Sequence, residues 1–145
     1  AYLHPSIEFF NPLAANHKWI LRSKIQSQIN FGNNFEFYQS ARAGLETGLR
    51  AYRRYRFLGK QSLIGSLDLQ HHFNQIKTSF IPIKIGLFVG GDTGRVWLPN
   101  ETSNKWHSSY GGGLLLSGAK LIQSNFGLFN GDDGLLVSIG FGAKL

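Results

Sequence analysis

A cationic segment, residues 48–60, carries the side chains best suited to binding chemistry. It interleaves basic residues with tyrosines, and its cations are Arg50, Arg53, Arg54, Arg56 and Lys60. Alternating arginine and tyrosine can stack on single-stranded nucleic acid, but no RNP, KH or helix-turn-helix pattern accompanies them. A solvated loop is the simplest alternative. A third is pairing with carboxylates, because a guanidinium binds a carboxylate through two parallel hydrogen bonds.

Asp68 and Asp92 are the carboxylates that such an arginine would meet. Both occupy even positions, on the polar face of segments whose odd positions are mostly apolar. A carboxylate that is taken out of water without a partner costs several kcal/mol. The sequence therefore predicts that one arginine of the cationic segment pairs with these two residues.

Other reactive combinations have weaker support. Residues 92–94 spell the Asp-Thr-Gly triplet of aspartic proteases, but Arg95 follows and a second triplet is absent. The five histidines lack metal-ligand spacing, and Gly111–Gly113 precede no Lys-Ser/Thr. Asp132 and Asp133 are candidate calcium ligands, although a polar loop tip is the favoured interpretation. We expect no catalytic residue, no metal and no cofactor.

The elements that position these residues follow a period of two. Residues 18–31 alternate apolar and polar side chains over 14 positions, which is long beside the ~5 to 6 residues of an average soluble strand. No stretch approaches the ~18 to 20 apolar residues of a transmembrane helix. Seven strands are predicted, at residues 6–10, 18–31, 62–73, 81–89, 106–116, 119–128 and 135–145.

The predicted connections alternate in length. Short turns are expected at residues 11–16, 74–79 and 117–118, and long loops at 33–61, 98–105 and 129–134. This alternation, with aromatic residues near strand ends, is typical of outer-membrane barrels. A soluble sandwich with one buried face is the alternative, and long strands with polar inner faces favour the barrel. The predicted fold class is all-β, an antiparallel transmembrane β-barrel.

The alternation also assigns the two faces of the sheet. The lumen face is expected to carry Arg22, Lys24, Asp68, Lys84, Asp92 and Lys144. The lipid face is expected to carry Trp19, Leu21, Ile25, Ile29, Leu67, Leu69, Ile83, Ile85, Leu87, Val137, Ile139 and Phe141.

Composition sets the outer bounds. The 145 residues, 42% hydrophobic and 16% charged, amount to one domain at most and are too apolar for a disordered chain. The chain has no cysteine, which excludes disulfides and thiolate metal sites. It has no methionine either, so we expect a processed chain or a piece of a longer protein.

Several motifs resemble the Omp85 superfamily, the outer-membrane assembly and secretion barrels of the BamA type. Leu49-Arg50-Ala51-Tyr52 is similar to the Arg-Gly-Phe/Tyr motif on that family's inward-folded sixth loop. Residues 88–97 resemble its Asp-x-Gly-x-Val-Trp strand motif, and residues 66–69 stand where the intervening strand has an acidic residue. Residues 106–116 and 135–145 are similar to the following strand and the closing strand.

The resemblance implies that residues 1–145 are the C-terminal portion, about seven strands, of a sixteen-stranded barrel with residues 33–61 folded inward. Its implied loop lock consists of Arg50, Tyr52, Asp68, Asp92 and Gly94, with Arg50 binding the two aspartates. Its implied closing strand carries Gly140, Phe141 and Gly142 beside a weak seam. Two positions depart from the family pattern: Ala51 replaces a glycine, and Leu145 replaces a terminal aromatic residue.

The implied function is non-enzymatic insertion or translocation of proteins at the bacterial outer membrane. The implied partners are lipid, client proteins, accessory assembly subunits and the rest of the parent barrel, with no nucleic acid. A small stand-alone barrel of about eight strands, acting as a pore or an anchor, is the second hypothesis. An enzyme is the third, because some family members carry a hydrolase domain before the barrel, but nothing in this sequence is catalytic.

Overall fold

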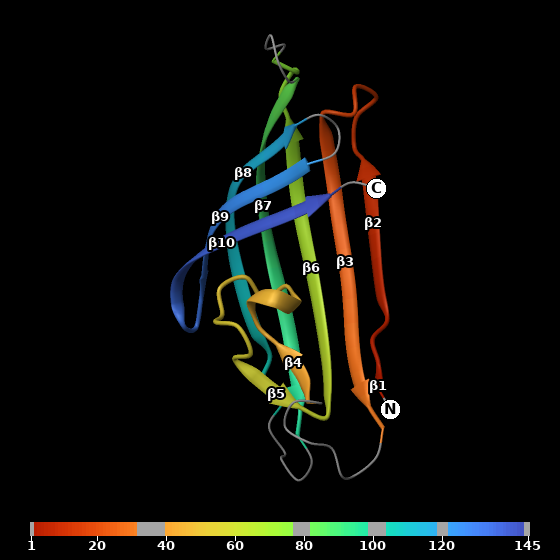
Figure 1. The fold of residues 1–145 in the computed structure, drawn as a ribbon, viewed down its shortest axis with the longest axis vertical. Coiled ribbons are helices and arrows are strands. Elements are labelled where there is room, and N and C mark those ends of the chain that lie inside the picture. The colour runs from red at the N-terminus through yellow and green to blue at the C-terminus, as the bar shows by residue number, and fades with distance from the viewer. Residues whose placement is uncertain (1, 32–39, 77–81, 99–103, 119–121, 144–145) are drawn as a thin grey trace.

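The chain is all-β and forms one long antiparallel sheet (Figure 1). A computed structural model describes residues 2–31, 40–76, 82–98, 104–118 and 122–143. The sheet strands are β1 (Tyr2–Leu3), β2 (Ser6–Pro12), β3 (Trp19–Asn30), β6 (Gln61–His72), β7 (Ile83–Trp97), β8 (His107–Gly118), β9 (Ile122–Gly131) and β10 (Gly134–Ala143). From β3 onward each strand pairs with the next of these in the chain.

β1 and β2 lie one after the other along the same edge of β3. The ladder is interrupted at Pro5, which has no backbone N–H to donate. β1 and β2 therefore count as one edge position of the sheet, so its eight strands form seven side-by-side rows. Since neighbouring rows are antiparallel, the first row and the last row, β10, run in the same direction.

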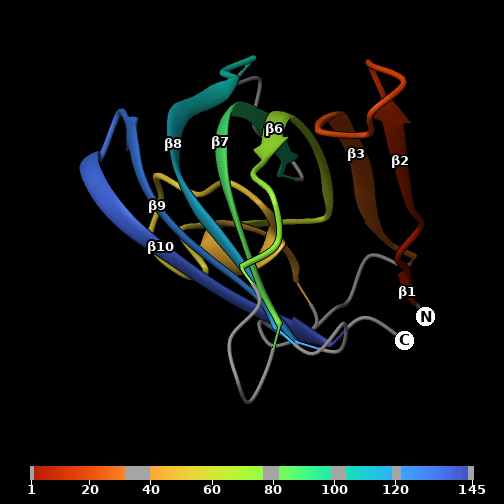
Figure 2. The same ribbon diagram turned by 90° about the horizontal axis from the view of Figure 1, so that it is seen from above.

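Seen from above, the sheet curls around a concave face (Figure 2). Within the described residues, β10 pairs only with β9, and β2 pairs only with β3, so the described strands do not close into a barrel. The all-β class and the antiparallel sheet are confirmed. Membership of a larger barrel stays a prediction.

Three predicted boundaries were wrong. The strand at 81–89 continues to Trp97, because Gly90 and Gly91 stay in register with β6 although they break the alternation. The long loop at 129–134 is instead a tight turn between β9 and β10, with Gly134 at φ 94°. Residues 117–118 belong to β8, and the predicted strand at 119–128 continues to Gly131. The predictions for residues 1, 32–39, 77–81, 99–103, 119–121 and 144–145 lie outside the described residues.

The chain between β3 and β6 packs, in its described residues, onto the concave face. Its described part, residues 40–60, contains β4 (Ala41–Ala43), a 3₁₀ turn η2 (Leu45–Thr47) and β5 (Phe57–Gly59), and β4 pairs with β5. We call residues 40–60 the inner loop. Ala41, Ala43, Leu49, Ala51 and Tyr52 of this loop are fully buried.

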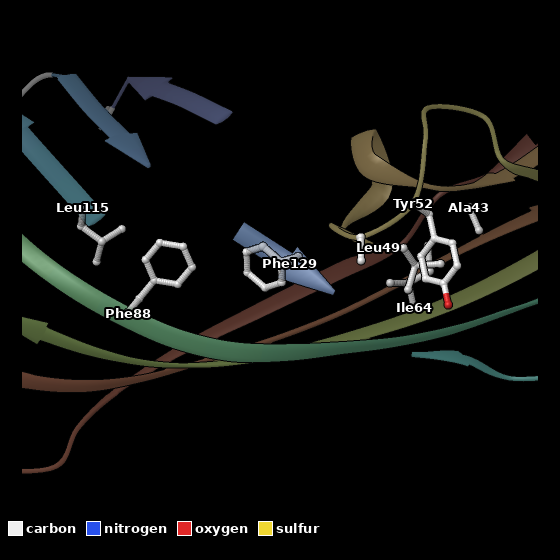
Figure 3. Packing of buried hydrophobic residues seen from close by; sticks show 8 residues of the cluster. Ala43, Leu49, Tyr52, Ile64, Phe88, Leu115 and Phe129 are labelled. Atoms are coloured by element: carbon white, nitrogen blue, oxygen red, sulfur yellow. The ribbon is translucent and has the colours of Figure 1, made fainter. Parts of the chain in front are cut away.

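The core lies between the inner loop and the sheet (Figure 3). Leu49 and Tyr52 pack near Ile64 of β6, and Phe129 of β9 separates them from Phe88 and Leu115. The long strands are thus covered by a loop, and the described residues contain no second layer of long strands. This arrangement differs from the two packed sheets of a sandwich.

Candidate functional site

The inner loop places Arg50 at the tip of a tight turn. Gly48 is the C-cap of η2, and its φ of 104° lies in the left-handed region that glycine adopts without strain. The Leu49 N–H then donates to the Gly44 carbonyl at 3.0 Å, and the Tyr52 N–H donates to the Leu49 carbonyl at 3.1 Å. These bonds fix the backbone on both sides of Arg50.

The Arg50 guanidinium binds both predicted aspartates. Its Nε lies 3.1 and 3.0 Å from the two carboxylate oxygens of Asp92, and its Nη2 lies 2.6 Å from Asp92 Oδ1. The same Nη2 donates to Asp68 Oδ1 at 2.6 Å. The Arg50 backbone N–H adds a bond of 3.2 Å to Asp92 Oδ2. The side chains of Asp68 and Asp92 are 2% and 0% exposed, so both carboxylates depend on these partners.

Two further residues complete the network, and the sequence did not single them out for it. Arg22 Nη1 donates to Asp68 Oδ2 at 3.0 Å, and its Nε donates to Glu8. Ser109 Oγ donates to Asp92 Oδ2 at 2.8 Å. Arg22 lies directly opposite Asp68 in the β3–β6 register, and Ser109 lies opposite Asp92 in the β7–β8 register. Cross-strand register is the signal that would have found them.

The surroundings of Arg50 favour its charged form. Burial lowers its pKa, but the hydrogen bonds and charges of Asp92 and then Asp68 outweigh burial, so the pKa stays above its usual value. The guanidinium carbon also lies 4.0 Å from the centre of the Phe129 ring. The arginine therefore remains a permanent cation between two carboxylates.

Tyr52 is buried beside the first residues of β8. Its hydroxyl donates to the Ser108 carbonyl at 3.1 Å and accepts from the Asp132 N–H at 3.4 Å. Burial raises the pKa of the Tyr52 phenol, which keeps it neutral and able to donate. Ala51, where the family motif has glycine, has no positive φ, so its side chain fits the backbone without strain.

Gly94 serves the site by leaving space. A Cβ at this position would lie 3.2 Å from both δ-carbons of Leu49 and 3.0 Å from Ile64 Cγ1. The glycine thus lets Leu49 of the inner loop approach β7. Gly90 has a similar role that the sequence did not suggest, since a Cβ there would overlap the Asp68 carboxylate.

The three residues of the predicted closing strand lie in β10. Gly140 faces Asn125 of β9, and a Cβ there would lie 2.6 Å from the Asn125 amide nitrogen. Phe141 is 75% exposed, and Gly142 has open space around its Cα. β10 is thus a lightly packed edge strand, remote in sequence from the Arg50 network.

The geometry of the Arg50 network suits a structural contact that anchors the inner loop to the sheet. Asp92 accepts from Arg50 and Ser109 through both oxygens, which leaves no room for the activated water of an aspartic protease. Asp132 and Asp133 face the cations Lys105 and Arg56 of this chain, and Asp132 also lies near the His107 ring. The described residues hold no cluster of three or more metal-ligating side chains.

Comparisons of the chain with protein-family models, with curated proteins and with solved structures each returned no match. The Omp85 resemblance therefore rests on the sequence motifs. A search of the described residues found no helix that is long and apolar enough to cross a membrane.

Proposed function

We propose that the chain is the C-terminal part of an Omp85-type barrel that assists insertion or translocation of proteins at the bacterial outer membrane. The observation that carries this proposal is the enclosed Arg50, which reaches from a loop to aspartates on two neighbouring strands. The two family motifs are far apart in the sequence, yet they meet in one network. If either motif resembled the family only by chance, there would be no reason for the two to contact each other.

The convex face supports a location in lipid. It presents large apolar side chains that are about half exposed, among them Ile25, Leu67, Val89, Leu114, Leu128, Val137 and Ile139. An apolar surface of this extent on a soluble protein would need a covering partner. Acyl chains are such a covering for a strand that alternates apolar and polar residues.

Aromatic residues gather at both ends of this face. Trp19 packs on His71, with ring centres 4.4 Å apart, and His71 contacts Phe73. At the other end, Trp97 and Trp106 meet edge to face at 6.4 Å. About ten residues of β6 separate the two levels, which corresponds to about 25 Å for a tilted strand and matches the apolar band of outer-membrane barrels.

The two edges of the described sheet, the β1–β2 row and β10, have room for further strands. In a closed antiparallel barrel neighbouring strands alternate in direction, so seven rows close only with an odd number of additional strands. Nine further strands would give the sixteen of the Omp85 family, and one would give the stand-alone barrel. The intact mass of the denatured protein separates these, since about 16 kDa leaves no room for nine more strands.

Reconstitution tests the function directly. Liposomes that contain the full-length protein should raise the yield of a urea-unfolded outer-membrane barrel that becomes folded and protected from protease, relative to empty liposomes. Ion conductance without any gain in client folding would instead favour the stand-alone pore and overturn the proposal.

Cysteine labelling tests the expected orientation. The native chain has no cysteine, so Asn104→Cys and Gln75→Cys each introduce a single reactive site; Gln75 lies just after β6 and Asn104 just before β8, at opposite ends of the sheet. In intact cells an impermeant maleimide should label the cysteine at position 104 and leave the one at position 75 unlabelled. Lysed cells are the control in which both should react, and the reverse pattern in intact cells would contradict the topology.

A further inference from the structure

A second set of contacts joins the inner loop to the tip of the β9–β10 hairpin. Asp132 and Asp133 form the turn, and Asp133 accepts two bonds from Arg56 of the inner loop, at 2.8 and 3.3 Å. Asp132 lies 3.6 Å from Nδ1 of His107, the first residue of β8, and 3.8 Å from Nζ of Lys105, which precedes that strand. The turn thus faces cations on two sides.

Aromatic contacts and a backbone hydrogen bond reinforce the same junction. The Phe57 ring stacks on the His107 ring, with centres 3.8 Å apart, and the Arg56 guanidinium lies 5.2 Å from the Phe57 ring centre. The Tyr52 hydroxyl accepts from the Asp132 N–H. The junction therefore combines ion pairing, stacking and a backbone hydrogen bond.

Gly131 fits the hairpin closely against the inner loop. A Cβ at this position would lie 2.9 Å from the Ala51 Cβ and 3.4 Å from Tyr52 Cε2. Real Cβ atoms do not approach that closely, so a larger residue at position 131 must displace the loop.

We propose that this junction, which we call the rim latch (Arg56, Phe57, His107, Asp132 and Asp133), couples the position of the inner loop to the order of the β10 edge. In the part of the chain that the structure describes, β10 has one strand neighbour, β9, and its first residue follows directly from the latched turn. Holding the turn therefore restrains β10 at one end, while releasing it leaves β10 held by the β9 ladder alone. The latch is separate from the Arg50 network, and the coupling does not depend on whether the protein handles clients.

Hydrogen exchange on the full-length protein in lipid nanodiscs tests the coupling. Asp133→Arg places two cations together, so exchange of the amides at 52–57 and at 135–141 should both accelerate about three- to fivefold, the range for a partly exposed ion pair. The double variant Arg56→Asp with Asp133→Arg should restore most of the protection. Arg53→Asp makes the same charge change at an exposed position of the loop and is the matched control, which should leave both segments unchanged.

A steric variant provides a test that is independent of charge. Gly131→Val should accelerate exchange at 52–57 and at 135–141 together, because the added side chain separates the hairpin from Ala51. Acceleration of the loop amides while β10 stays protected, in either Asp133→Arg or Gly131→Val, would overturn the coupling. Failure of the charge-swapped double variant to restore protection would overturn the role of the Arg56–Asp133 pair.

Discussion

Arg50→Ala is expected to release the inner loop from the sheet while the sheet remains folded. The substitution leaves Asp92 and Asp68 buried without their main partner, and breaking a buried pair in this way costs about 3–5 kcal/mol. Arg22 and Ser109 remain as partners, and water entering the concave face will reduce the cost. Limited proteolysis of the folded protein should therefore cut within residues 44–57 much faster than in the unmodified protein.

Arg53→Ala is the matched control for this experiment. Arg53 is three residues away on the same loop and is exposed, so its loss should leave the cleavage rate unchanged. Arg50→Lys should give an intermediate rate, because lysine keeps the charge but cannot bind two carboxylates with a planar fork. Equal cleavage of the Arg50→Ala and Arg53→Ala proteins would show that the arginine network does not hold the loop.

Leu67→Arg is expected to destabilise the protein in a membrane by about 2–4 kcal/mol, the cost of a cation on the lipid face at mid-depth. Leu67 lies on the convex face, midway along β6 between the levels of Trp19 and Trp97, and is 53% exposed. On a water-exposed face the same substitution would cost little. Urea unfolding in phospholipid vesicles measures the free energy of unfolding of the Leu67→Arg variant relative to the unmodified protein.

Ile83→Arg provides the depth control. Ile83 is the first residue of β7, at the end of the sheet, where a cation costs only about 0–1 kcal/mol. If Leu67→Arg is as harmless as Ile83→Arg, the convex face does not lie in lipid.

The sequence predicted the long strands well where alternation was strong. β3 and β6 lie within two residues of the predicted ends, because a strand with one polar face and one apolar face carries the signal in nearly every residue. β7 was cut short because Gly90 and Gly91 carry no hydropathy signal, and only pairing with β6 and β8 shows that the strand continues.

The inner loop was beyond local prediction. β4, η2 and β5 are three residues each, too short to show a period, and their order comes from packing on the concave face. The hairpin turn at Asp132–Asp133 was predicted as a long loop because polar residues and glycines are common both in tight turns and in long loops.

The aspartates of the site were predictable from their place on the polar face, but the full network was not. Arg22 and Ser109 are ordinary polar residues of predicted strands, and their contribution depends on which residue lies opposite them. The assignment of Arg50 among the cations of its segment came from the motif resemblance. Its buried position and its two carboxylate partners are features of the structure.

Spin-label scanning along β10 in the full-length, membrane-embedded protein tests the central claim most directly. Labels at Val137 and Ile139 should collide with oxygen dissolved in lipid, while labels at Leu136 and Gly142, which lie on the other face of β10, should collide with a water-soluble nickel complex. If the convex surface faces lipid, accessibility to oxygen and accessibility to the nickel complex should each alternate every two residues, and one should be high where the other is low. Equal accessibility to the nickel complex at all four positions would contradict it, because both faces of β10 would then be in water.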